Sequence, residues 1–111
     1  MSRPILGLTE RVVIYGKKRK QVIARIDTGA QKNSICTSLA SQLELGPVLR
    51  TVRIRSATGR QVRPVVKAKM KIGPKLINAS FSLADRTHMK YDLLIGTNTL
   101  KKGFLIDPSK K

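Results

Sequence analysis

Apolar and polar positions alternate with a period of two over much of the chain, which is the pattern of strands with one buried face. The clearest example is 51–55, where Val52 and Ile54 are separated by polar residues. Similar runs, bounded by turns that contain glycine or proline, lie at 11–15, 21–27, 61–72, 76–83, 92–96 and 104–107. Short strands at this spacing predict a mainly antiparallel all-β barrel or sandwich.

Two short stretches favour a helix instead. Leu39 and Leu43 share one face of a predicted helix that Thr37 is expected to cap. The Gly46-Pro47 pair is expected to end this helix. One more helical turn is predicted at 98–102.

The longest predicted strand is part of a hairpin, about 53–72, whose small tip contains glycine. Pro64 lacks the amide hydrogen that a central strand needs, so this part is expected to lie at an edge or to bend. Such a hairpin suits a mobile lid over a site, and it equally suits a plain antiparallel meander. Residues 31–36, before the first helix, are predicted to form a polar loop.

The chain has 111 residues, which predicts a single domain over 1–111 with a modest core. Aromatic residues make up 4% and tryptophan is absent, so the core is expected to be aliphatic. The 23 Lys and Arg residues against 6 Asp and Glu give a net charge of +17. This excess predicts attraction to nucleic acid, an acidic membrane surface or an acidic peptide. The basic run 17–20 is more typical of a solvated hairpin tip.

Cysteine and histidine are too scarce for a disulfide framework or a metal centre. Cys36 is the only cysteine and His88 the only histidine, so Cys36 is expected to be buried and His88 to lie at the surface or in a loop. The amino terminus has no apolar signal segment, and no run approaches transmembrane length. These features predict a soluble, cytoplasmic protein with no membrane partner, metal or other cofactor.

One stretch carries candidate chemistry, because the apolar strand 22–26 leads into Asp27-Thr28-Gly29-Ala30. The strand delivers a carboxylate, Gly29 lets the backbone turn without a Cβ, and Thr28 can hydrogen-bond locally. Taken alone, an Asp-Thr-Gly tripeptide is more often a turn that the aspartate caps than a catalytic loop.

Much later in the chain, Leu93-Leu94-Ile95-Gly96 is followed by the second predicted helix. The Asp-Thr-Gly-Ala loop, a hairpin and the Leu-Ile-Gly strand occur in the order and spacing of the retropepsin-like aspartic proteases, which the chain resembles from about Val13 to Ser109. A narrower branch, described as ATP-dependent zinc proteases and associated with ligases that add glutamate tails to a ribosomal protein, shares further features. These are Arg55-Ser56, Gly59, Arg63-Pro64-Val65, Asp85-Arg86, Met89, Leu100 and Asp107-Pro108-Ser109.

The resemblance implies an acid-protease barrel with one lobe per chain, acting as a homodimeric aspartic endopeptidase. The two Asp27 carboxylates, one from each chain, would activate a water molecule, one as base and the other as acid. Thr28 would brace this pair, and Gly29 would contact the substrate. The resemblance further implies a set of substrate-binding residues: Ala30, Lys32, Thr58, Gly59, Arg60 and Gly96.

Two departures from the retropepsin pattern concern the dimer. Arginine usually follows the Leu-Ile-Gly glycine, where this chain has Thr97. In viral members that arginine pairs with an acidic residue, where this chain has Gln31 and Lys32. Both halves of the ion pair are replaced, and the sequence does not show what braces the dimer instead. The zinc in the narrower family's name has no support, because a His-Glu-x-x-His motif is absent from the sequence.

Charge adds a hypothesis about the substrate. Basic residues on the hairpin (Arg55, Arg60, Arg63) and beside the loop (Arg25, Lys32) predict attraction of an acidic peptide such as a glutamate tail. Two other functions stay open: a non-catalytic basic β-barrel that binds RNA or another polyanion, and an inactive retropepsin-like assembly protein. The first has the net charge in its favour but lacks a platform of aromatic side chains for stacking bases.

Overall fold

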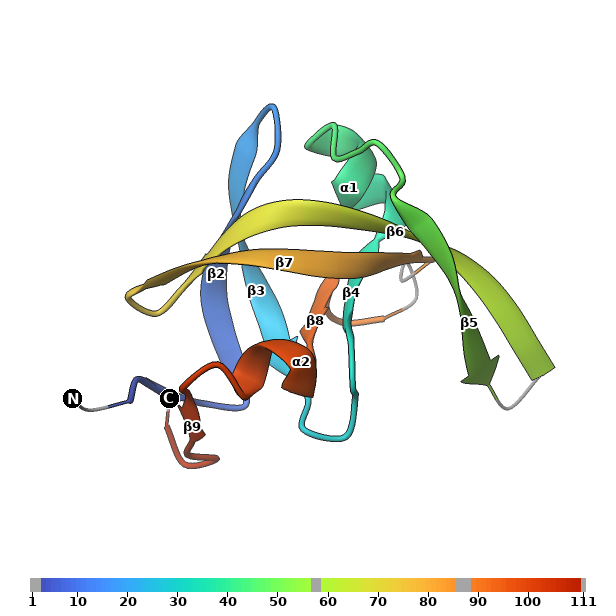
Figure 1. Cartoon of the computed structure of the whole chain (residues 1–111). Helices are drawn as coiled ribbons and strands as arrows, with labels where there is room; N and C mark the ends of the chain where they lie inside the picture. The colour runs from blue at the N-terminus through green and yellow to red at the C-terminus, as the bar shows by residue number, and fades with distance from the viewer. Residues whose placement is uncertain (1–2, 57–58, 86–88, 111) are drawn as a thin grey trace.

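The computed structural model describes residues 3–56, 59–85 and 89–110, which fold into a closed β-barrel with two short helices (Figure 1). Going round the barrel, the strands are β2 (Thr9–Tyr15), β3 (Arg19–Ile26), β8 (Leu93–Ile95), β4 (Asn33–Cys36), β7 (Lys75–Ala84) and β6 (Gly59–Ile72). Pairing of β6 with β2 closes the ring. Outside it lie β1 (Ile5–Leu6), β5 (Arg50–Ser56), β9 (Leu105–Ile106), α1 (Thr37–Gln42) and α2 (Thr97–Leu100). The predicted all-β barrel, one lobe in the chain, is confirmed.

Two strand pairs of the ring are parallel, and they decide where the candidate site forms. β3 runs parallel to β8, with Ile26 beside Ile95, and β4 runs parallel to β7. The remaining pairs of the ring are antiparallel, as the sequence predicts. Because the carboxyl ends of parallel strands reach the same edge of a sheet, Asp27 after β3 and Gly96 after β8 become neighbours.

The prediction of a polar loop over 31–36 is wrong for most of that stretch. Asn33–Cys36 forms β4, whose four residues are all buried between β7 and β8. Asn33 and Ser34 have the polarity of loop residues, but the backbone of β4 pairs with a strand on each side. The burial of this short strand is therefore set by partners far away in the sequence rather than by its own pattern.

The core inside the barrel is aliphatic, as expected from the scarcity of aromatic residues. Its largest fully buried side chains include Ile14, Ile35 and Met70, together with one aromatic residue, Phe81. Cys36 is also buried, as predicted. The polar residues that are buried, by contrast, gather around the candidate site described below.

Both predicted helices form, but α1 has different ends from those expected. The N-cap position of α1 is Cys36, which makes no side-chain capping hydrogen bond, so the expected cap at Thr37 is wrong. The helix also ends before Gly46-Pro47, because Glu44 adopts a left-handed φ of 53° and turns the chain. In the described part of the chain, no helix is long and apolar enough to cross a membrane.

The hairpin formed by β5 and β6 projects from the barrel, at the right of Figure 1. Its outer part is held by the pairing of β5 with β6, because the pairing of β6 with β7 begins only at Val65. Pro64 lies opposite Thr51 just beyond that point. The predicted edge position of Pro64 is confirmed, since the missing amide hydrogen is not needed by a second neighbour. The hairpin tip, residues 57–58, lies outside the described residues.

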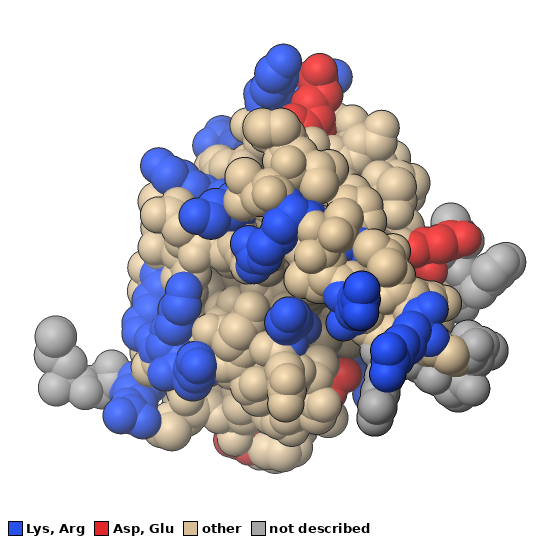
Figure 2. Space-filling model, turned by 45° about the vertical axis from the view of Figure 1, so that its right-hand side comes forward, with Lys and Arg blue, Asp and Glu red and all other residues tan. Residues whose placement is uncertain are grey.

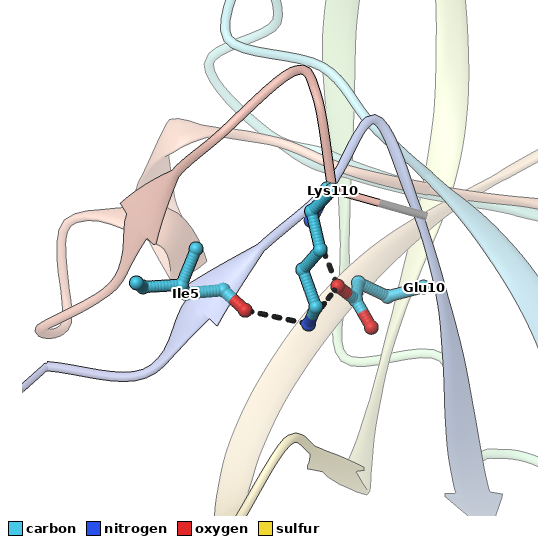
Figure 3. A network of polar contacts seen from close by, with 4 residues as sticks. Ile5, Glu10 and Lys110 are labelled. Atoms are coloured by element: carbon cyan, nitrogen blue, oxygen red, sulfur yellow. Dashed lines mark hydrogen bonds and ion pairs between the residues drawn. The ribbon is translucent and has the colours of Figure 1, made fainter.

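The two ends of the chain are held together beside the barrel (Figure 1). β1 and β9 pair in parallel, and the Lys110 ammonium donates to Glu10 Oε1 at 2.8 Å and to the Ile5 carbonyl oxygen at 2.7 Å (Figure 3). The sequence pattern did not predict β1. Two residues after β1, the Leu8 carbonyl oxygen accepts a hydrogen bond from the Ile26 amide at 2.9 Å. The terminal segments thus support the end of β3.

Asp107 closes the turn after β9. Asp107 Oδ1 accepts two hydrogen bonds, one from the Ser109 hydroxyl at 2.6 Å and one from the Ser109 amide at 2.9 Å. These two hydrogen bonds favour the ionised carboxyl and lower the pKa of Asp107 below its usual value. The turn is therefore held more firmly once Asp107 is ionised.

Candidate active site

Asp27 stands at the end of β3, where the parallel pair β3–β8 delivers it to the edge of the barrel. Its amide donates to the Ile95 carbonyl oxygen at 2.9 Å, which continues the strand pairing by one residue. Its half-buried side chain is oriented by its own loop, because Oδ1 accepts a hydrogen bond from the Gly29 amide at 2.9 Å. The Ala30 amide then donates to the Asp27 carbonyl oxygen at 3.3 Å and closes the turn. The carboxylate is held in place while facing outward from the core.

The structure shows what a Cβ at Gly29 would meet. The backbone of Gly29 is not in the left-handed region, so the turn does not demand glycine through φ. A Cβ at Gly29 would instead lie 3.2 Å from Asp27 Oδ1, closer than most Cβ contacts. Glycine therefore keeps space beside the carboxylate. Thr28 and Gly29 are both exposed on the single chain.

The segment after Asp27 lies directly on the turn between β8 and α2. The Thr97 amide donates to the Ala30 carbonyl oxygen at 2.8 Å, and a Cβ at Gly96 would come within 2.6 Å of the Lys32 carbonyl oxygen. Gly96 is buried under this segment. Gly96 supports the loop from below and is not among the residues that line the neighbouring cleft, so its expected contact with substrate stays a prediction.

Asn33 is a residue of the site that the sequence analysis missed. Only 1% of it is exposed, and its Oδ1 accepts a hydrogen bond from the Gly96 amide at 2.9 Å. Its Nδ2 donates to Thr99 Oγ1 at 2.9 Å and to the Ser80 carbonyl oxygen at 3.2 Å. Asn33 thereby joins β4, β7 and α2 beneath the Asp27 loop. An asparagine in a stretch that looks like a loop gives no sequence signal for this role.

The variant Asn33→Ala is expected to lose about 3 kcal/mol of free energy of unfolding, because it leaves the buried Gly96 amide and Thr99 hydroxyl without their partner. Asn98→Ala is the matched control, since Asn98 Oδ1 has no hydrogen-bond partner among the described residues. The control is expected to change stability by less than about 0.5 kcal/mol. Urea denaturation measures both, and equal losses would contradict the role given to Asn33.

A cleft of about 440 Å³ opens between the Asp27 loop and the projecting hairpin. Its lining residues are Ala30, Gln31, Lys32, Ser34, Arg53, Ile54, Arg63, Ser82 and Leu94. Of the residues expected to bind substrate, Ala30 and Lys32 line this cleft. Gly59 and Arg60 are exposed farther along the hairpin, and Thr58 lies outside the described residues. Asp27 is not among the residues that line this cleft, whereas Ala30, whose amide closes the Asp27 turn, is.

A second hollow, of about 430 Å³, adjoins the first and shares Gln31 and Lys32 with it. Its other lining residues are Arg50, Ser80, Thr97, Asn98 and Lys101. This basic hollow is therefore bordered by the residues that stand where retropepsins have their ion pair: Thr97 on one side of that pair, and Gln31 and Lys32 on the other. Among the described residues that line the two hollows, none is acidic. Figure 2 shows Lys and Arg side chains spread over the face on the β5 side, with few acidic side chains among them.

Metal binding was not expected from the sequence. Among residues 3–56, 59–85 and 89–110, no three His, Cys, Asp or Glu side chains are grouped to hold a metal ion. His88 lies outside these ranges, so its predicted surface position stays a prediction.

Comparison with protein families identifies the family to which the chain belongs. Residues 36–111 match the RimB-like family, described as the retropepsin-like aspartic endopeptidase RimB. The chain belongs to this RimB-like family. The match covers more than half of the chain but begins at Cys36, so the Asp27 loop lies outside it. No curated protein matches the sequence significantly.

Solved structures show the same fold. Lpg0085 of Legionella pneumophila, a protein of unknown function, superposes with a TM-score of 0.70 at 20% identity, covering 99% of this chain and 97% of that one. EIAV protease complexed with the inhibitor HBY-793 superposes with a TM-score of 0.68 at 20% identity, covering 90% of this chain and 86% of that one. Simian Foamy Virus (mac) protease superposes with a TM-score of 0.64 at 15% identity, covering 84% of this chain and 91% of that one. The retropepsin-like resemblance is confirmed, whereas the narrower resemblance to ATP-dependent zinc proteases stays a prediction.

Proposed function

We propose that this RimB-like protein is an aspartic endopeptidase that works as a homodimer, with one Asp27 from each chain in a shared active site. The observation that carries the proposal is the Asp27 loop. Its carboxylate stands at the end of a parallel strand pair, is oriented by the Gly29 amide, and belongs to a retropepsin-like barrel. The alternative in which Asp27 only caps a turn does not account for the buried support that Gly96 and Asn33 give to this loop.

The chemistry needs two carboxylates around one water molecule. The ionised carboxylate takes a proton from water, and the protonated one donates to the oxygen of the scissile carbonyl. Two carboxylates this close cannot both ionise, so they share one proton. The chain contains a single Asp-Thr-Gly sequence, and the second copy must come from a second chain. The exposure of Thr28 and Gly29 on the single chain leaves the surface around Asp27 available to that partner.

We further propose that the substrate is an acidic peptide, such as one that contains a run of glutamate. The charge of +17 supports this, and so does its distribution. Lys32 borders both hollows, Arg53 and Arg63 line the first, and Arg50 and Lys101 line the second. The described residues that line the two hollows include these cations and no acidic residue. Such a concentration of positive charge raises the local concentration of an anionic peptide and its rate of association.

Cleavage of two matched fluorogenic peptides tests this function, one with six consecutive Glu residues and one with Gln in their place. At low salt we expect at least about 10-fold higher kcat/KM for the Glu peptide, and most of this advantage should vanish at high salt, where charge steering is screened. Size-exclusion chromatography with light scattering should show a dimer. A protein that is monomeric at every concentration and cleaves neither peptide would contradict the proposal.

A second candidate function is favoured by a different surface. Lys67, Lys69 and Lys71 are exposed in alternation along β6, on the outside of the barrel. A basic ladder of this kind suits binding of RNA or another polyanion without catalysis. Asp27→Asn separates the two candidates, because it should abolish peptide cleavage and leave polyanion binding unchanged.

A further inference from the structure

Five basic side chains share the outer surface of three neighbouring strands of the barrel. They are Arg11 on β2, Arg19 on β3, and Lys67, Lys69 and Lys71 on β6, and all five are exposed. We call this set the outer basic face. Strand pairing brings its members side by side, because β2 lies between β3 and β6 in the sheet. None of them lines either hollow beside the Asp27 loop.

The sheet holds these cations in fixed positions. Tyr15 is the register partner of both Arg19 and Lys69, so these two stand on either side of it. The lysines of β6 alternate with side chains that are buried inside the barrel: Val66, Ala68, Met70 and Ile72. Successive lysines are therefore about 6.7 Å apart along the strand and point to the same side.

The positive charge of the outer basic face is not compensated within the described part of the chain. None of its five residues forms an ion pair with a described residue. Glu44 lines a small hollow together with Lys67, but the two form no ion pair. Like charges at neighbouring positions of one face repel each other, so a polyanion that lies across this face relieves the repulsion.

We propose that the outer basic face binds double-stranded RNA through its phosphates. The inference goes beyond the proposed endopeptidase and does not depend on it, and it names a partner for the second candidate function. The lysines of β6 extend over about 13 Å, and a duplex with the charge density of B-DNA carries about 8 phosphate charges along such a length. Five cations in this area displace counterions from several phosphates at once, which favours binding.

The other side chains of this surface favour a duplex over a single strand. Tyr15, which is only partly exposed, is the one aromatic residue of β2, β3 and β6, whereas proteins that bind single strands stack bases on several aromatic rings. Uncharged polar groups favour RNA over DNA. Asn78 and Ser80 on β7 are the register partners of Lys69 and Lys67. Amides and hydroxyls can donate to or accept from the 2′-hydroxyls that line the shallow minor groove of an RNA duplex.

Fluorescence polarisation of a labelled RNA duplex of about 20 base pairs tests this proposal with the full-length protein. Wild type should bind with a Kd of about 1 µM or tighter at about 50 mM salt. It should bind a DNA duplex of the same sequence, and either RNA strand alone, at least about 3-fold more weakly. The triple variant Lys67→Gln, Lys69→Gln, Lys71→Gln should raise Kd at least about 10-fold and lower the salt slope of log K by about 2 to 3.

The matched control replaces Lys32, Arg50 and Lys101 with Gln, because these three exposed cations line the second hollow. Each triple variant lowers the net charge of +17 by three, so long-range attraction weakens alike in both. The control should raise Kd by less than about 3-fold. Equal weakening in the two triple variants would overturn the proposal, since binding would then follow net charge rather than the outer basic face.

The same three lysines changed to Arg give a variant that keeps the charge, and it should bind the RNA duplex within about 3-fold of wild type. The Gln variant should unfold at the same urea concentration as wild type, because its three altered side chains are exposed. A folded Gln variant that binds the RNA duplex as tightly as wild type would overturn the proposal. So would a DNA duplex or a single strand that binds as tightly as the RNA duplex.

The outcome is independent of peptide cleavage, because RNA binding is measured without a peptide. If the protein binds the RNA duplex through the outer basic face but shows no Asp27-dependent cleavage, the proposed endopeptidase fails and the RNA proposal stands. If it cleaves peptides but the two triple variants bind RNA alike, the RNA proposal fails and the endopeptidase stands.

Discussion

Replacing Asp27 with asparagine is expected to lower kcat/KM for peptide cleavage by at least about 10³-fold. An amide cannot take a proton from water or share one with the carboxylate of the second chain. Asparagine keeps an oxygen that can accept the hydrogen bond of the Gly29 amide, so the loop should hold its shape. The free energy of unfolding should therefore change by less than about 0.5 kcal/mol. Cleavage of the six-Glu peptide and urea denaturation measure the two quantities.

Asp92→Asn is the matched control, because Asp92 is an exposed aspartate just before β8, the strand that pairs with β3. It should leave cleavage unchanged. Mixing subunits sharpens the experiment: in an exchanged equimolar mixture of wild type and Asp27→Asn, activity should fall to about one quarter if two Asp27 residues act together, and to about one half if each chain acts alone. The second result would contradict the shared active site.

Gly96→Ala is expected to cost about 3 kcal/mol of free energy of unfolding. Gly96 is not in the left-handed region, so the cause is contact rather than backbone strain: its φ is −98°. An alanine Cβ would lie 2.6 Å from the oxygen and 2.8 Å from the nitrogen of Lys32. Because both are backbone atoms, the segment after Ala30 must move, and cleavage should fall together with stability. Urea denaturation and peptide cleavage check the two effects.

Thr97→Val is the control for this substitution, because it changes the next residue without adding bulk against Lys32. Its free energy of unfolding should lie within about 1 kcal/mol of that of wild type. If Gly96→Ala were as stable and active as this control, the close contact between Gly96 and Lys32 would not hold the Asp27 loop in place.

Local patterns carried most of the fold prediction. Alternation in 51–55 and 61–72 predicted the hairpin, and Pro64 predicted its edge position, because side-chain burial and a missing amide hydrogen act within a few residues. The ends of α1 were predicted less well. Glu44 turns the chain through a left-handed conformation that glutamate rarely adopts, so the residue type did not predict this helix end.

The buried polar residues could not be predicted in this way. Asn33 bonds to Gly96 and Thr99, which are 63 and 66 residues away, and Ser34 faces Ser82 across β4 and β7. Read along the chain, both serines and the asparagine resemble loop or strand-surface positions. Their burial follows from the insertion of β4 between two strands that are remote in sequence.

By itself, the sequence determined the class of fold, the charge and the carboxylate at Asp27, because alternation, composition and a four-residue motif are all local. The tertiary structure alone decided that Gly96 lies beneath the Asp27 loop, that Asn33 ties this support together, and that the buried Ser34 and Ser82 are among the residues that line a basic cleft. The physical reason is that these contacts join strands far apart in the sequence, in the parallel pairs β3–β8 and β4–β7 and in the antiparallel pair β4–β8. Such pairing brings distant residues within hydrogen-bond reach without leaving a periodic pattern in the chain.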